Sequence, residues 1–171
     1  TLLGSATGTF LQEWGPATRE FFGARSGTPI SSLEGVLVSG LYLPETDDQL
    51  ERAVAIETLD TDEYAAAVAA RPAVADAVVE LMDAYLLDAL AYPSVSDSPV
   101  RLGNDQTGNN CATASVGGLP AISMPAGLTS NGHAVGVELL GRPWSEPTLI
   151  RLASGYEAAA DPRVPPPIEV P

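Results

Sequence analysis

The chain has 171 residues, of which 45% are hydrophobic and 18% are charged, a balance typical of a folded globular domain. Twenty-two acidic residues outnumber eight basic ones, so the formal net charge is −14, and nucleic acid and anionic membranes are excluded as expected partners because both are polyanions. The single cysteine excludes an intrachain disulfide, and with one histidine it leaves too few soft ligands for zinc, so we expect no metal and no cofactor.

The first forty residues predict two short helices. Apolar residues at helical spacing lead up to the pair Gly15-Pro16, which should end the first helix. Ser31 or Ser32 is a suitable cap for the second, and Gly40 should stop it. The start at Thr1, without a basic segment and an apolar core behind it, predicts that any targeting peptide has been removed.

Longer helices are expected next. Residues 47–58 place Leu50 on an apolar face. Asp60, followed three residues later by Glu63, imitates a capping box for an alanine-rich helix. That helix should kink or restart at Pro72 and continue, strongly amphipathic, to about residue 90.

The period of the pattern then changes from helix to strand. Residues 89–92, 119–125 and 134–140 predict three strands, and Ser130-Asn131-Gly132 predicts a hairpin-like turn between the last two. A final helix should follow Ser145 as its cap. The uncharged stretch 106–137 contains too many glycines and prolines for a membrane helix.

This order of elements predicts an α/β sandwich with part of its sheet missing. We expect residues 1–90 to form a mainly helical covering region, residues 91–160 to supply the strands and the closing helix, and residues 161–171 to run as an extended proline-rich tail. The second strand is apolar on both faces, so it needs neighbours that three strands alone do not provide.

Catalytic candidates within the chain are weak. A serine nucleophile needs a base, and the lone imidazole, His133, lies in the predicted turn, where it should face solvent. Cys111 either acts as a thiolate, for which it needs a group that lowers its pKa, or is a small buried residue that opens a short helix; we favour the second. Thr1 could use its own α-amine as a base, but the residues after it do not continue as a strand.

The loop 103–111 is the best candidate for binding a substrate. It follows a strand end, where α/β proteins gather ligand groups, and its amides suit a neutral substrate. The candidate substrate-binding residues are Gln106, Asn109, Asn110 and Cys111. Alternatively, these amides satisfy only the backbone of their own turns.

Several segments in the same order resemble the amidase signature family of amide hydrolases. They are DALAYPS at 88–94, GLPAISMPAG at 118–127 and VGVELLGRPWSE at 135–146, with weaker likeness reaching back to residue 10. The resemblance implies the C-terminal part of an α/β/α sandwich with a mixed central sheet, and an acyl-enzyme mechanism by a serine, a cis-serine and a lysine.

This chain contains no lysine and no glycine/serine-rich signature segment. The resemblance therefore implies that the catalytic residues come from an N-terminal amidase segment or a companion chain, and that the substrate is a small-molecule amide. The alternatives are a non-catalytic interaction module with an amidase-like fold and a hydrolase that uses Thr1.

Overall fold

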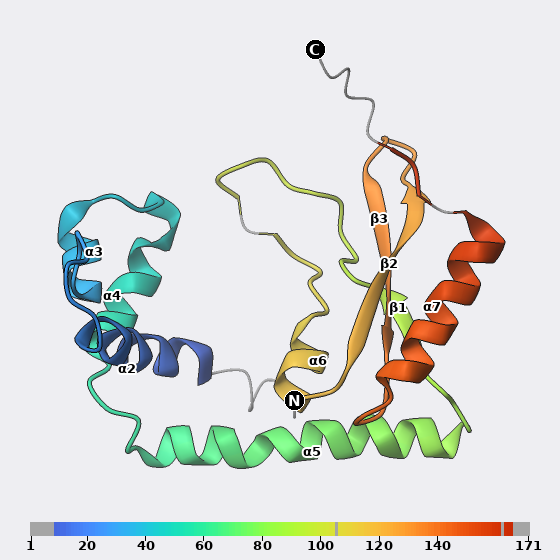
Figure 1. Cartoon of the computed structure of the whole chain (residues 1–171), viewed down its shortest axis with the longest axis horizontal. Helices are drawn as coiled ribbons and strands as arrows, with labels where there is room; N and C mark the ends of the chain where they lie inside the picture. The colour runs from blue at the N-terminus through green and yellow to red at the C-terminus, as the bar shows by residue number, and fades with distance from the viewer. Residues whose placement is uncertain (1–8, 105, 162, 166–171) are drawn as a thin grey trace. The chain divides into compact units, whose positions relative to one another are not determined.

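The computed structural model describes residues 9–104, 106–161 and 163–165. The chain divides into two compact units, residues 1–71 and residues 72–171. In the described part of the first unit (Figure 1) lie α2 (Thr9–Gly23), α3 (Leu33–Ser39), the short 3-10 helix η1 (Pro44–Thr46) and α4 (Asp47–Ala55). Helix α5 (Asp62–Ala84) begins in the first unit and ends in the second.

Helix α2 continues through Gly15-Pro16, so the prediction that this pair ends the helix is wrong. The reason is tertiary. Gly15 is buried against α4, and a Cβ at this position would overlap the carbonyl oxygen of Ala53 and lie 3.2 Å from the carbonyl oxygen of Ile56. A glycine here lets the two helix backbones touch, and that contact outweighs the helix-breaking tendency of the pair.

The ends of α3 are those that the sequence predicted. The hydroxyl of Ser32 accepts a hydrogen bond from the Gly35 amide at 2.9 Å, and Gly40 adopts a left-handed conformation with φ 63°. Helix α4 ends at Ala55, three residues earlier than expected. The Arg19 guanidinium of α2 donates to the carbonyls of Val54 and Ile56 at 2.5 and 2.6 Å, and so satisfies the C-terminal end of α4.

The first unit has a small apolar core between its helices. Leu33, Leu50 and Ala53 are buried at its centre, from α3 and α4, and Trp14 of α2 packs against them. This core confirms the apolar face that was predicted for Leu50.

Helix α5 differs from its prediction at both ends. Its first-turn cap is Thr61, whose hydroxyl accepts from the Tyr64 amide at 3.1 Å, so the capping box based on Asp60 is wrong. The helix passes through Pro72 without a restart and ends at Ala84, short of residue 90. The amides of Leu86 and Leu87 turn back onto the carbonyls of Asp83 and Met82, and Leu86 is left-handed with φ 53°.

The second unit contains a three-stranded antiparallel sheet. Its strands β1 (Leu90–Pro93), β2 (Ala121–Leu128) and β3 (Ala134–Leu140) lie in the order β1-β3-β2 (Figure 1). The three predicted strand segments and the hairpin between the last two are confirmed. The α/β class is confirmed, and the described strands pair only antiparallel.

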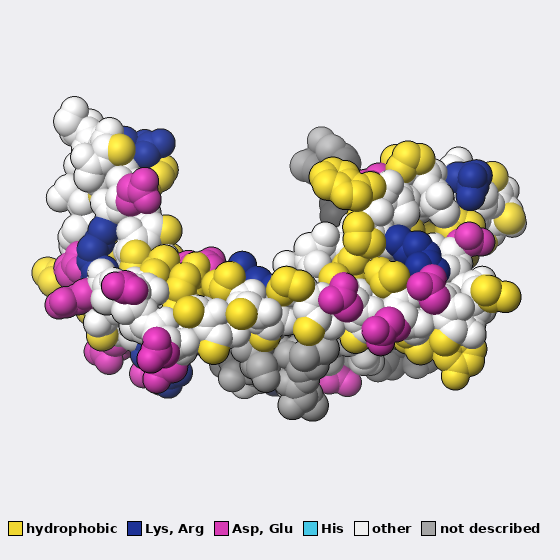
Figure 2. Space-filling model, turned by 90° about the horizontal axis from the view of Figure 1, so that it is seen from below, with side chains coloured by type: hydrophobic (Ala, Val, Ile, Leu, Met, Phe, Trp, Pro, Cys, Tyr) yellow, Lys and Arg dark blue, Asp and Glu magenta, His cyan; other side chains and the backbone are white. Residues whose placement is uncertain are grey.

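Helices complete the second unit. The short α6 (Ala112–Gly117) precedes β2, and α7 (Glu146–Ala160) packs on β2 and β3. Ser145 precedes α7 as predicted, but its hydroxyl donates to the Arg142 carbonyl at 2.7 Å and caps no amide of the helix. The core side chains buried most completely are Met82, Leu140 and Leu149. Apolar and acidic side chains both reach the surface on the face drawn in Figure 2.

Candidate functional site

Polar side chains cross the sheet in one row. Strand register places Tyr92 of β1 and Ser123 of β2 on either side of Glu138 in the central strand. Glu138 is only 8% exposed, and the Tyr92 hydroxyl donates to its Oε1 at 2.6 Å. Burial raises the pKa of Tyr92 far above its ordinary value, and the hydrogen bond to the Glu138 carboxylate adds a smaller effect in the same direction. The pair thus keeps a buried carboxylate satisfied.

Next to this row, two serine hydroxyls meet above the central strand. The Oγ atoms of Ser94 and Ser123 are 2.7 Å apart although β1 and β2 are not neighbours. Gly136 of β3 lies between them, and a Cβ there would lie 3.2 Å from one hydroxyl oxygen and 3.3 Å from the other. Among the described residues neither hydroxyl has a side-chain base as a hydrogen-bond partner. The arrangement offers polar contacts rather than an activated nucleophile.

The segment between β1 and α6 folds back on itself. Val95 and Asn109 form an antiparallel bridge, and the Ser96 amide donates to the Gly108 carbonyl at 2.8 Å. Gly108 has φ +72°, and a Cβ there would lie 2.9 Å from the carboxylate of Asp97. A glycine is therefore needed at this turn.

The predicted binding amides hold this loop together. The Gln106 side-chain amide donates to the carbonyls of Ser98 and Thr107 at 3.4 and 2.9 Å and accepts from the Val100 amide at 3.3 Å. These bonds tie the two limbs of the loop to each other. Gln106 is thus placed by the backbone that surrounds it.

The neighbouring asparagines also bond to the loop. The Asn110 amide donates to the carbonyl of Pro93 at 2.7 Å and to the Ser96 hydroxyl at 3.3 Å. The Asn109 side-chain oxygen accepts from the Cys111 amide at 2.8 Å. Cys111 itself is exposed, so our expectation of a buried residue is wrong: it precedes α6 at the surface.

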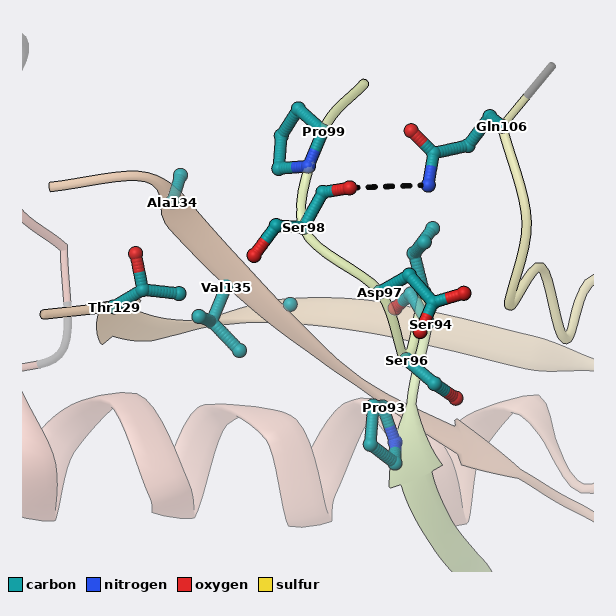
Figure 3. A pocket seen from close by; sticks show the side chains of 12 residues that line it. Pro93, Ser94, Ser96, Asp97, Ser98, Pro99, Gln106, Thr129, Ala134 and Val135 are labelled. Carbon is teal, nitrogen blue, oxygen red and sulfur yellow. Dashed lines mark hydrogen bonds between the residues drawn. The ribbon is translucent and has the colours of Figure 1, made fainter. Parts of the chain in front are cut away.

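A cavity of about 380 Å³ opens between the segment that joins β1 to α6 and the end of the β2–β3 hairpin. Figure 3 shows the Ser98 hydroxyl directed toward the side where Val135 and Thr129 lie, with Gln106 across from them. Of the predicted binding residues, Gln106 lines this cavity, whereas Asn110 lines a second, more apolar one of about 350 Å³ beside Tyr92. The full lining of the first is Pro93, Ser94, Val95, Ser96, Asp97, Ser98, Pro99, Gln106, Thr129, Ala134, Val135 and Gly136.

Asp97, Ser98 and Thr129, which also line this cavity, were not predicted as site residues. The run of Ser94, Ser96 and Ser98 directly after a strand was the available signal, since alternate hydroxyls after a strand end are placed for ligands. The sequence around Thr129 did not indicate a site, because only the fold of the β2–β3 hairpin brings this residue to the cavity.

The other candidate groups stand apart from this cavity. His133 is exposed in the β2–β3 turn, and Thr1 lies outside the described residues. Within the described ranges, no three His, Cys, Asp or Glu side chains are grouped to hold a metal ion. No helix in that same part of the chain is long and apolar enough to cross a membrane.

Comparison with known proteins shows which family this chain matches. The model of the Amidase family matches residues 27–150. The chain is similar to a glutamyl-tRNA(Gln) amidotransferase subunit from Methylocella silvestris, at 33% identity over 90 residues that cover 47% of this chain and 18% of the relative. The corresponding protein from Beijerinckia indica is 50% identical over 52 residues, which cover 30% of this chain and 10% of the relative.

Two solved structures have a similar fold over 94% of this chain. The native peptide amidase of Stenotrophomonas maltophilia matches with a TM-score of 0.71 and 26% identity, over 94% of this chain and 34% of that one. An amidase family protein of Bacillus anthracis has the same fold, with a TM-score of 0.75, 20% identity, and coverage of 94% and 30%. The chain thus spans about a third of the length of these structures and 18% of the Methylocella relative. It belongs to the Amidase family.

Proposed function

We propose that this chain is the C-terminal portion of an amidase that hydrolyses a carboxylic amide C–N bond through a serine acyl-enzyme. The catalytic serine, cis-serine and lysine would come from a preceding segment or a companion chain. The observation that carries the proposal is the family match over residues 27–150 in a sequence that contains no lysine. A chain of this family without a lysine needs another source for the base.

The chemistry of the described serines supports this assignment. Ser94 and Ser123 bond to each other, and the imidazole of His133 is exposed in a turn. A serine becomes a strong nucleophile when an adjacent base takes its proton. Among the described residues these hydroxyls have no such partner, so their role in the proposal is contact and not attack.

The segment then has an architectural and a binding role. Residues 91–160 would supply strands and a closing helix to the larger sheet, residues 1–90 a helical cover, and residues 161–171 a surface tail. The loop 103–111, with Gln106, Asn109, Asn110 and Cys111, would form part of the wall of the pocket for a small-molecule amide. The placement of Gln106 at the 380 Å³ cavity supports this role.

A companion also fits the surfaces of the second unit. With the order β1-β3-β2, the outer edge of β2 pairs with no other described strand. An open strand edge is a ready template for a further strand. The name of the similar Methylocella protein describes it as one subunit, which supports assembly with another polypeptide.

The test is to acylate the serine and find the chain that carries it. Protein isolated from its natural source would be treated with phenylmethylsulfonyl fluoride, and denaturing mass spectrometry would locate the label, while ammonia release from simple amides is followed. We expect the label on a lysine-containing polypeptide or segment other than these 171 residues, with loss of ammonia release. The 171-residue chain produced alone should release no ammonia.

Labelling of a serine within this chain would overturn the proposal, because the nucleophile would then lie here. Folded, soluble protein with no second species and no hydrolysis would instead support the non-catalytic module.

A further inference from the structure

The cavity beside the loop has one formal charge in its lining. Asp97 is the sole charged residue among those that line it, and the residues facing it are hydroxyl, amide or apolar. No described arginine is part of this lining: Arg142 pairs with Asp83 at 2.7 Å, and Arg163 lines a neighbouring cavity. The cavity is therefore negative, in a chain whose net charge is −14.

The Asp97 carboxylate keeps unused bonding capacity. Among the described residues one donor reaches it, the Thr107 hydroxyl, which bonds Oδ2. An ionised carboxylate can accept about four hydrogen bonds. The other oxygen is free to accept from a ligand, and no described arginine lies within ion-pair distance of it.

The remaining polar groups suit a small amide. The Ser98 hydroxyl is directed toward the side of Val135 and Thr129 (Figure 3), and the Thr129 hydroxyl accepts from the His133 amide at 3.0 Å, which leaves its own hydrogen free to donate. A hydroxyl that donates can hold an amide carbonyl, and one that accepts can hold an amide N–H. Val135 and Pro99 supply apolar contact. The volume of about 380 Å³ falls within the range of small-molecule sites.

We propose that this cavity binds small amides that carry an ammonium group, and that Asp97 is the residue that determines this preference. Neutral amides bind more weakly, and amides that carry a carboxylate are rejected, because the cavity offers them no cation. The choice of an amide as the ligand rests on the proposed function; the charge preference rests on the lining of the cavity.

The experiment is a titration of the isotopically labelled 171-residue chain, followed by NMR at the signals of Gln106, Ser98 and Val135. The probes are glycinamide, acetamide and succinamate, which carry an ammonium group, no charge and a carboxylate. We expect glycinamide to bind about fivefold more tightly than acetamide, the upper end for an ion pair that stays partly solvated. Succinamate should cause no saturable shift.

Two variants assign the preference. Asp97→Asn keeps an oxygen that can accept from Thr107 and should make glycinamide and acetamide bind equally. Glu157→Gln removes the same charge from an exposed site on α7 and should leave the fivefold preference unchanged. Added NaCl should weaken glycinamide binding and leave acetamide binding unaltered, which tests the same ion pair if Asp97→Asn fails to fold.

Equal binding of the three probes, equal effects of the two variants, or no saturable binding at these signals would overturn the proposal. None of these results tests the proposed function, because the titration measures binding and not amide hydrolysis. Conversely, acylation of a serine in this chain would overturn the proposed function and leave the charge preference standing.

Discussion

The polar residues in the middle of the sheet differ in their tolerance of substitution. Glu138 lies in the central strand with 8% exposure, and Tyr92 supplies the hydrogen bond that satisfies it. A buried carboxylate that loses its donor keeps its full desolvation cost. Ser123 is exposed and Ser94 is half-buried, so water can replace either partner. Stability at this site therefore depends on Tyr92 and Glu138 more than on Ser94 and Ser123.

Tyr92→Phe should lower the free energy of unfolding by about 2 kcal/mol at neutral pH, because it removes a hydrogen bond to a charged group. Urea denaturation measures the change. Tyr85→Phe is the matched control: Tyr85 is 70% exposed, and the change there should be close to zero. Equal losses in the two variants would show that the hydroxyl of Tyr92 is not what stabilises the sheet.

The same substitution has a signature in alkaline solution. The pKa of Tyr92 is raised in the folded chain, so its contribution to stability is fully present below the phenol pKa of the unfolded chain, about 10, and is lost as the pH rises beyond it. Tyr92→Phe should thus lose less stability than the unmodified chain as the pH is raised above about 10. Hydrogen bonding to Asp47 and burial raise the pKa values of Tyr42 and Tyr64, respectively, and both keep their own slope in either protein. Parallel pH curves would contradict this account.

Leu86 occupies a position that glycine usually fills. It follows α5 with φ 53° and is 92% exposed, while the amides of Leu86 and Leu87 close the helix end. A left-handed conformation costs a residue with a Cβ roughly 1–2 kcal/mol. Leu86→Gly should therefore raise the free energy of unfolding by about 1 kcal/mol, after the larger backbone entropy of glycine in the unfolded chain is subtracted.

Leu86→Ala separates the causes, since alanine keeps the Cβ and removes the exposed apolar side chain. Chemical denaturation should show no gain for this variant. A gain equal to that of Leu86→Gly would mean that the exposed side chain, and not the backbone conformation, was the source of the cost.

At the scale of elements, local signals predicted the ends that depend on local chemistry. Helix α3 begins after Ser32 and ends before Gly40, because a capping hydroxyl at the start and a left-handed glycine at the end are sufficient for a short helix. The failures are the ends decided by distant contacts. Gly15-Pro16 stays helical because α4 packs against it. Helix α5 ends at Ala84, just before the left-handed Leu86, where the pattern offers no stop signal.

The candidate site shows the same division. The amides of Gln106, Asn109 and Asn110 could be selected from the sequence, because side-chain amides in a loop after a strand end either meet a ligand or bond to the backbone of their own turns. All three do bond to backbone groups. Their bonds to the carbonyls of Pro93 and Ser98 could not be predicted, since these depend on the loop folding back over several residues.

Gly15→Ala tests the contact between α2 and α4. The added methyl group would meet the Ala53 carbonyl, which is backbone and cannot rotate away, so we expect a loss of about 3 kcal/mol in the free energy of unfolding. Gly23→Ala is the control in the same helix, since a Cβ there has no neighbour within 4 Å, and it should be neutral or slightly stabilising. Circular dichroism during urea denaturation gives both values. Similar effects of the two changes would show that α2 and α4 are not in close contact in solution.

At the scale of the whole molecule, charge is the dominant feature. Twenty-two acidic residues and eight arginines give −14, and the described ion pairs engage Arg19, Arg71 and Arg142 with partners that are partly exposed. Such pairs contribute about 0–1 kcal/mol each. Repulsion among the remaining acidic groups grows as the chain becomes compact, so it opposes folding. The net electrostatic effect should therefore be destabilising at low ionic strength.

The thermal midpoint at pH 7 should accordingly rise as NaCl is increased from about 0.01 M to 1 M, since the Debye length falls from about 30 Å to about 3 Å over that range. Differential scanning calorimetry measures the slope. The control uses the chain itself: near pH 4, close to its pI of about 4.1, the net charge is near zero and the rise should vanish. The few ion pairs would then make salt neutral or slightly destabilising, because screening weakens them. A rise of equal size at both pH values would show that the salt acts through hydration of apolar surface and not through charge.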